Sequence, residues 1–133
     1  MSDGQAWRWL EWLDGYETAW RTPGTALLAD LFTPDAVYLR TPYADPVVGL
    51  AGIGRLWERD RQGPDEVFTL THELVATTGR IGVVRCLVRY GDPLEPEYTD
   101  LWVVDLDEDG RCTRFEEWPF WPQSPRSAPS ARD

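Results

Sequence analysis

Asp100 and Glu117 are the two residues best placed by type and spacing to do chemistry. They lie in two β-rich segments, 98–106 and 112–118, that a tight acidic turn joins, so we expect the segments to pair as adjacent strands. Because side chains alternate along a strand, each carboxyl group shares its face with an aromatic residue. Two carboxyl groups in an aromatic-lined cavity raise each other's pKa, and burial raises both further. Such a pair can divide the roles of general acid and general base.

Tyr16 and His72 are two further candidates. Tyr16 lies on the aromatic face of an expected helix, where its phenol could donate to a ligand oxygen or, equally, serve as a core residue whose hydroxyl meets the backbone or Asp100. His72 shares a strand face with apolar residues, and as the only histidine it could act as a base near neutral pH. A lone histidine on an apolar face is more often a core residue, and no nucleophilic partner for it is visible in the sequence.

Several sequence patterns resemble metal-binding or phosphate-binding motifs, but the secondary structure expected around them differs from that of real sites. Residues 105–116 match the spacing of a calcium loop, yet they join two expected strands rather than two helices, which favours an acidic hairpin turn with Gly110 at a positive φ. The glycines of 49–54 follow a very short strand, so tight helix packing explains them better than phosphate binding. Cys86 and Cys112 with one histidine make no convincing zinc site, and the absence of lysine excludes a Schiff-base mechanism. We therefore expect no metal and no cofactor.

Hydrophobic spacing predicts the elements that would position these residues. Helical periodicity predicts an amphipathic helix over about 5–21, a short second helix ending near residue 32, and a third over about 50–61. The expected strands cover residues 36–40, 47–48, 67–77, 81–90, 98–106 and 112–118. Long consecutive strands pair as a meander and need helices over one face. The sequence thus predicts an α+β cone, a curved antiparallel or mixed sheet with three helices from the N-terminal half on its concave side, as in a cystatin-like roll. A pocket would form on that side.

Length, composition and charge narrow the class of protein. The 133 residues suit a single domain, which we expect over 1–122, followed by a disordered tail rich in Ser, Pro and Arg over 123–133. A formal net charge of −10 argues against binding to nucleic acid or to an anionic membrane surface. The polar N-terminus is no signal peptide, and no apolar run reaches the roughly 20 residues that span a bilayer. With two cysteines only, these features predict a reducing, cytoplasmic setting.

The order of these elements, together with particular residues, resembles the nuclear transport factor 2-like superfamily, which includes ketosteroid isomerase and the SnoaL-like polyketide cyclases. The segments that carry the resemblance are Leu31-Phe32-Thr33-Pro34-Asp35-Ala36-Val37-Tyr38, the stretch from Pro46 to Gly49 before Ile53 and Trp57, Tyr98-Thr99-Asp100-Leu101-Trp102, and Asp109 to Cys112 with Phe115-Glu116-Glu117-Trp118. The resemblance covers about residues 6–122. Proteins of this fold include enzymes, carriers and inert scaffolds.

The resemblance also implies roles for four residues. Tyr16 falls where the family has its oxyanion-hole tyrosine, Asp100 falls where it has the acid beside that tyrosine, and the faces that carry Asp100 and Glu117 are concave. At the position of the family's basic aspartate, this sequence has Arg40, which departs from the steroid isomerases. Arg40 would point inward and either orient the two carboxyl groups for general acid/base catalysis or form a buried structural ion network with one of them.

The expected function is that of a small-molecule pocket protein with three alternatives. It could be a cofactor-independent isomerase, cyclase or hydrolase acting on an apolar oxygenated ligand such as a polyketide or terpenoid fragment, a non-catalytic carrier of such a ligand, or an interaction module whose cavity its own aromatic residues fill. The side chains expected to line the pocket are Trp20, Tyr38, Trp57, His72, Trp102 and Phe115.

The opposite, convex face of the sheet is the expected place for a partner. Alternation puts on it the side chains of Arg85, Arg89, Leu101, Val103, Glu116 and Trp118. An exposed sheet face with tryptophan and aliphatic residues needs cover. The resemblance implies a homodimer through this face, and a helix or the tail lying over it is the alternative.

Overall fold

The computed structural model of the chain describes residues 6–60, 68–90, 97–121 and 124–127. The helices and strands follow in the order α1 (Ala6–Arg21), α2 (Leu28–Leu31), β1 (Phe32–Leu39), β2 (Val47–Val48), α3 (Leu50–Asp60), β3 (Phe68–Thr78), β4 (Ile81–Tyr90), β5 (Glu97–Leu106), β6 (Cys112–Trp121) and β7 (Ser124–Ser127). The three predicted helices and the six predicted strands are all present, and β7 is additional.

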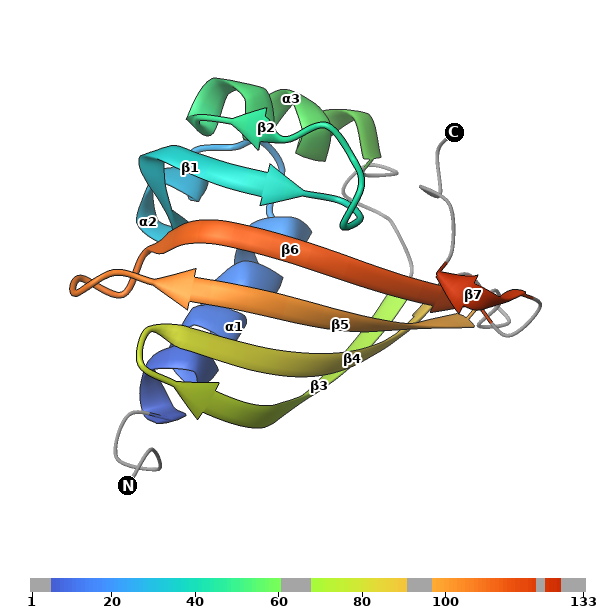
Figure 1. The fold of residues 1–133 in the computed structure, drawn as a ribbon. Helices are drawn as coiled ribbons and strands as arrows, with labels where there is room; N and C mark the ends of the chain where they lie inside the picture. Colours follow the sequence, from blue (N-terminus) through green and yellow to red (C-terminus); the bar gives the residue numbers. More distant parts are fainter. Residues whose placement is uncertain (1–5, 61–67, 91–96, 122–123, 128–133) are drawn as a thin grey trace.

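One curved, unclosed sheet forms the body of the molecule (Figure 1). Its strands lie in the order β2-β1-β6-β5-β4-β3, and β7 pairs with β6. Strand β1 runs parallel to β6, whereas every other described pair of strands is antiparallel. Helix α1 crosses the sheet on one side, and α2 and α3 pack near β1 (Figure 1). The predicted α+β fold, with a curved mixed sheet and three helices, is therefore confirmed.

Helix α1 packs on the sheet through an aromatic face. The buried residues of α1 are Trp9, Trp12, Leu13, Tyr16 and Ala19. The Nε1 atoms of Trp9 and Trp12 donate to backbone carbonyls of Val104 and Leu31 at 3.1 and 2.9 Å. Gly82 on β4 lets the Trp9 ring approach the strand, because a Cβ atom there would lie 2.4 Å from the indole. Among the described helices, none is long and apolar enough to span a membrane.

Strand β1 begins earlier than the sequence predicted. It starts at Phe32 and contains Pro34, a residue that we expected to lie outside the strand as a helix stop. The parallel pairing with β6 shifts register between Phe32 and Val37, so Pro34 falls within an irregularity. Because proline has no N–H to donate, such an irregular stretch of a strand can accommodate it. Strand β6 likewise extends past its predicted end at residue 118, to Trp121.

The hairpin turn between β5 and β6 is the acidic turn that the sequence favoured. Gly110 has a φ of 84°, as predicted. The Asp107 Oδ1 atom accepts hydrogen bonds from the backbone N–H groups of Asp109 and Arg111 at 2.9 and 3.0 Å. The acidic residues of this segment thus stabilise a turn, and within the described residues no group of three or more His, Cys, Asp and Glu side chains is arranged to hold a metal ion.

Strand β7 occupies part of the segment that we predicted to be disordered. Ser124–Ser127 pairs antiparallel with the end of β6. Backbone pairing requires no apolar side chain, so a Ser, Pro and Arg-rich composition does not prevent a short edge strand. The remainder of the predicted tail lies outside the described residues.

Candidate functional site

The two carboxyl groups predicted to act together are brought onto one face of adjacent strands. Trp102 of β5 lies opposite Glu117 of β6, and Asp100 lies opposite Pro119. Asp100 and Glu117 are therefore diagonal neighbours across the strand pair, a separation that carboxyl side chains can bridge. Their common face is the inner one, because Asp100 and Trp102 are 1% and 3% exposed.

Asp100 is closed off from solvent and held by one indole. Its Oδ2 atom accepts a hydrogen bond of 3.0 Å from Nε1 of Trp102. No N–H or hydroxyl group of the described residues donates to its Oδ1 atom. The remaining hydrogen-bond partner of Asp100 is the carboxyl group of Glu117. Since Oδ1 is a buried acceptor without a donor, a proton on the neighbouring Glu117 carboxyl favours the negative charge on Asp100.

Glu117 differs from Asp100 in exposure and in its partners. It is half-buried, and its Oε1 atom accepts a hydrogen bond of 3.4 Å from the Tyr38 hydroxyl. Burial raises the pKa of Glu117 well above 4.5, and both the negative charge of Asp100 and the hydrogen bond between the two groups raise it further. The positive charge of Arg40 and the Tyr38 hydrogen bond act in the opposite direction but are weaker.

Burial favours the neutral form of both carboxyl groups, and their proximity favours one shared proton over two negative charges. Burial also raises the pKa of Asp100, while the hydrogen bonds from Glu117 and Trp102 lower it. The hydrogen bond between the two groups thus favours the proton on Glu117 and the negative charge on Asp100. This arrangement combines a proton donor and a proton acceptor in one place, which acid/base catalysis requires.

Arg40 lies close enough for its charge to act on Glu117, as the sequence analysis expected of an inward-pointing arginine. It is half-buried just beyond the end of β1. Its charge lowers the pKa of Glu117, and therefore favours ionisation of that carboxyl. The same position suits either of the two predicted roles, orientation of the carboxyl pair or a structural ion network.

The predicted pocket-lining aromatic residues contact one another. The ring of Tyr16 lies with its centroid 4.7 Å from that of Trp102, 5.1 Å from Trp57 and 5.9 Å from Phe115. Trp20 stacks on Tyr16 at 6.5 Å and meets Trp57 edge-on at 4.8 Å. Except for half-buried Trp20, these side chains belong to the hydrophobic core, and so does Tyr38. The aromatic residues therefore form a packed cluster beside the carboxyl pair.

Cys86 is the residue beside the carboxyl pair that the sequence analysis missed. It lies directly opposite Asp100 on the neighbouring strand β4, with its side chain fully buried. Burial raises the pKa of its thiol strongly, and the negative charges of Asp100 and Glu117 raise it further. The thiol therefore stays protonated, which makes it a poor nucleophile. Strand alternation could have placed Cys86 on the inner face, but its pairing with Asp100 depends on the register.

His72 lies farther from the carboxyl pair than a direct catalytic partner would. It is half-buried on β3, directly opposite Cys86. Two strand spacings, roughly 10 Å, therefore separate its backbone from that of Asp100. His72 is on the inner face, as predicted, and belongs to the same cross-strand row as Cys86 and Asp100.

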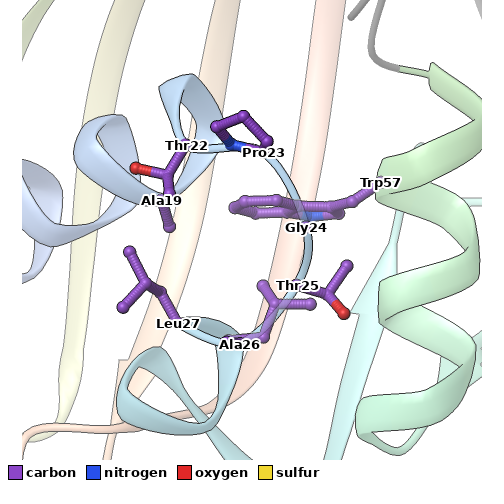
Figure 2. A pocket seen from close by; sticks show the side chains of 9 residues that line it. Ala19, Thr22, Pro23, Gly24, Thr25, Ala26, Leu27 and Trp57 are labelled. Carbon is purple, nitrogen blue, oxygen red and sulfur yellow. The ribbon is translucent and has the colours of Figure 1, made fainter. Parts of the chain in front are cut away.

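A small cleft lies on the helical side of the molecule, away from the carboxyl pair. Its lining consists of Ala19, Thr22, Pro23, Gly24, Thr25, Ala26, Leu27, Leu28 and Trp57. Figure 2 shows the α1–α2 connection curving around it opposite the Trp57 ring. The cleft has room for about one water molecule. The Trp57 ring thus lines the cleft, and it also contacts Tyr16 in the aromatic cluster.

Solved structures of similar fold include several enzymes. A steroid delta-isomerase from Pseudomonas aeruginosa is 21% identical, with a TM-score of 0.64 over 88% of this chain and 82% of that chain. The epoxide hydrolase/cyclase-like enzyme SalBIII, from pyran ring formation in the polyether salinomycin, is 18% identical, with a TM-score of 0.66 over 91% and 94% of the two chains. A candidate polyketide cyclase from Sinorhizobium meliloti is 21% identical, with a TM-score of 0.64 over 80% and 93%. At these identities the similarity establishes the fold.

The sequence itself matches a defined family. A search of curated proteins gave no match. The family described as the SnoaL-like domain matches residues 13–115, which include the second half of α1, Arg40, Asp100 and most of the sheet and end two residues before Glu117. This chain therefore belongs to the SnoaL-like domain family, within the nuclear transport factor 2-like superfamily.

Proposed function

We propose that this protein is a cofactor-independent acid/base enzyme that acts on a small, apolar, oxygenated molecule. The observation that carries the proposal is the Asp100–Glu117 pair, two carboxyl groups on the inner face of adjacent strands, each with a pKa that burial raises. The free thiols of the two buried cysteines suit the reducing cytoplasm, which we propose as its location.

In the proposed chemistry, the carboxyl pair first donates a proton to the ligand and then accepts one. The Glu117 carboxyl donates its proton to an oxygen of the ligand, and the carboxyl pair then accepts a proton that leaves the ligand or an attacking water or hydroxyl group. The pair ends with one proton, as it began, so no cofactor is consumed. Arg40 stabilises the Glu117 carboxylate that forms during the first step. In this proposal, Tyr16 polarises a ligand oxygen.

Isomerisation, cyclisation and hydrolysis all need such a donor and acceptor. The names of similar structures include a steroid isomerase and an epoxide hydrolase/cyclase-like enzyme, which agrees with an apolar ligand that carries oxygen. We propose polyketide or terpenoid fragments as the ligand class. The proposed contacts to the ligand are made by Trp20, Tyr38, Trp57, His72, Trp102 and Phe115.

The test begins with a ligand screen by thermal unfolding against steroids, polyketide fragments, terpenoid epoxides and simple aromatic acids. A ligand at one hundred times its Kd adds about 2.7 kcal/mol to the free energy of unfolding. With a stabilising class in hand, turnover is compared in wild type, Asp100→Asn, Glu117→Gln and the control Glu108→Gln, which changes an exposed carboxyl in the β5–β6 turn. We expect the first two variants to fold and lose turnover while the control keeps it. Full activity in Asp100→Asn and Glu117→Gln would refute the proposal.

A non-catalytic module is the second candidate, and the packing of the aromatic cluster favours it. Tyr16, Trp57, Trp102 and Phe115 already contact one another, as they would in a cavity that the protein fills itself. Binding without turnover in the same screen would favour a carrier. No stabilisation by any of the four compound classes would favour an interaction module.

We also propose that the convex face of the sheet is a homodimer interface. On this face, Leu101 and Val103 are half-buried in the single chain, and Trp118 is 38% exposed. Exposed charges of both signs accompany them, as in the ion pair between Arg85 and Glu73 at 3.1 Å. Sedimentation should find a dimer in the wild type and a monomer in Trp118→Glu. A wild type that stays monomeric at high concentration would contradict this interface.

A further inference from the structure

We infer that Trp102 is a positioning residue that fixes Asp100 as the negatively charged member of the carboxyl pair and leaves Glu117 to present the proton. The inference rests on the proposed function, which it deepens by giving the two carboxyl groups different tasks. It also gives Trp102 a task other than contact with a ligand.

The first support is the position of Trp102 between the two carboxyl groups. Trp102 lies two residues after Asp100 on β5, so both side chains point to the same face, and it lies directly opposite Glu117 on β6. Its Nε1 atom donates to Oδ2 of Asp100 at 3.0 Å. An indole has one N–H donor only, so this bond uses all of its hydrogen-bonding capacity.

The second support is that the indole itself is held firmly. Trp102 is 3% exposed, and its ring lies 4.7 Å from Tyr16 and 5.1 Å from Phe115, measured between ring centroids. A side chain that two packed aromatic rings contact has few alternative rotamers. The donor therefore stays directed at Oδ2, while Oδ1 of Asp100 has no hydrogen-bond partner among the described residues.

The third support is the difference in exposure between the two carboxyl groups. Asp100 is 1% exposed, whereas Glu117 is half-buried. We therefore assign the contact with a ligand to Glu117. Asp100 then acts through Glu117, because its fixed negative charge keeps the neighbouring proton in place until a ligand oxygen accepts it.

The eight indole N–H groups of the chain provide a direct test by NMR, which needs no ligand. The Trp102 signal is assigned by its loss in Trp102→Phe, and all indole signals are followed across pH in the wild type and in Glu117→Gln. We expect the Trp102 signal to move with pH because its acceptor changes charge, and its midpoint to change in Glu117→Gln. The Trp12 signal is the internal control, since that N–H donates to a buried backbone carbonyl at 2.9 Å.

Matched variants separate the role of Trp102 from simple loss of packing. Trp102→Phe and Trp12→Phe each remove one buried indole donor, but only the first bond ends on a carboxylate. Loss of the donor in Trp102→Phe should raise the pKa of Asp100, because the Trp102 hydrogen bond lowers it in the wild type. The side-chain carboxyl ¹³C shift of Asp100, assigned through Asp100→Asn, measures this. Trp12→Phe should leave that titration unchanged, although both variants lower stability.

Two results would overturn the inference. One is a Trp102 indole signal as insensitive to pH as that of Trp12. The other is an Asp100 titration that is the same in Trp102→Phe and in the wild type. A different result would refute the proposed function alone. In that case the Trp102 indole signal would still move with pH, while Asp100→Asn and Glu117→Gln would leave turnover unchanged.

Discussion

Glu117 makes the stability of the folded chain depend on pH in an unusual direction. Its pKa in the folded protein lies well above its ordinary value of 4.5, so the folded state binds this proton more tightly than the unfolded state does. The favourable contribution of the group is complete below about pH 4.5 and is lost as the pH rises through the folded pKa.

The first prediction compares wild type with Glu117→Gln by urea unfolding between pH 4 and pH 8. A glutamine cannot ionise, so the stability of the wild type relative to the variant should fall with rising pH. The slope should approach about 1.4 kcal/mol per pH unit while one proton separates the two states. Glu108→Gln alters an exposed carboxyl, so the difference in free energy of unfolding between this variant and the wild type should not change with pH. A flat line for Glu117→Gln would mean that this carboxyl does not hold the proton.

The second prediction concerns the thiol beside the pair. Burial and two nearby negative charges keep Cys86 protonated, so a thiol reagent at neutral pH should modify it only when the protein opens. The rate of modification by a chromogenic disulfide should therefore rise steeply at the urea concentrations that unfold the protein. Rapid modification of Cys86 in the native protein, identified by peptide mass, would contradict its placement.

Individual residues of the site could be predicted to different degrees. Asp100 and Glu117 followed from strand alternation and from the short turn between their strands, because both are local properties. The neighbours Cys86 and Tyr38 depend on how distant strands are aligned, and a shift of one residue would turn either side chain away. The mutual contact of the aromatic residues depends on packing, which alternation does not describe.

At the scale of elements, the contact between α1 and β4 depends on one residue without a side chain. The third prediction is that Gly82→Ala destabilises the protein, because its Cβ atom would lie 2.4 Å from the Trp9 ring and force the helix away. Overpacking of this kind costs about 1–3 kcal/mol or more. Thermal unfolding measures the loss. The matched change Gly54→Ala within α3 places its Cβ at 3.5 Å from Thr25, an ordinary contact, and should not destabilise the helix.

The fourth prediction links the α1–α2 connection to α3. A Cβ at position 54 would lie 3.6 Å from the Cβ of Thr25, which is within the range of disulfide bonds. The double variant Thr25→Cys with Gly54→Cys should form a disulfide under oxidising conditions and gain up to about 3.6 kcal/mol of stability. Urea unfolding of the double variant in its oxidised and reduced states measures the gain. The reduced state is the control, because it has the same sequence without the disulfide. Failure of the two thiols to oxidise would show that the connection sits farther from α3.

Element types were predictable where the hydrophobic period was long, as in α1 and β3 to β6. The boundary between α2 and β1 was not, because it is set by pairing with β6, about eighty residues later in the sequence. Strand β7 was missed for a related reason, since its pairing with β6 involves the backbone and leaves no trace in the hydrophobic pattern.

At the scale of the whole molecule, the net charge of −10 opposes the proposed dimer. The fifth prediction is that association through the convex face strengthens with salt, because screening reduces the repulsion between two acidic chains. Sedimentation at about 0.01 M and 0.15 M salt should give a smaller dissociation constant at the higher value. The opposite trend would mean that ion pairs across the interface outweigh the overall repulsion.

The parallel pairing of β1 with β6 has a consequence for how the chain acquires its site during synthesis. Tyr38 and Glu117, which meet through a hydrogen bond, are 79 positions apart in the sequence. A ribosome must therefore complete β6 before β1 and β5 are joined, and until then each of these two strands has one unpaired edge. Folds with such distant contacts form slowly and expose strand edges while they wait. The carboxyl pair is thus among the last parts of the sheet to be assembled, because β6 joins the two halves of the strand order.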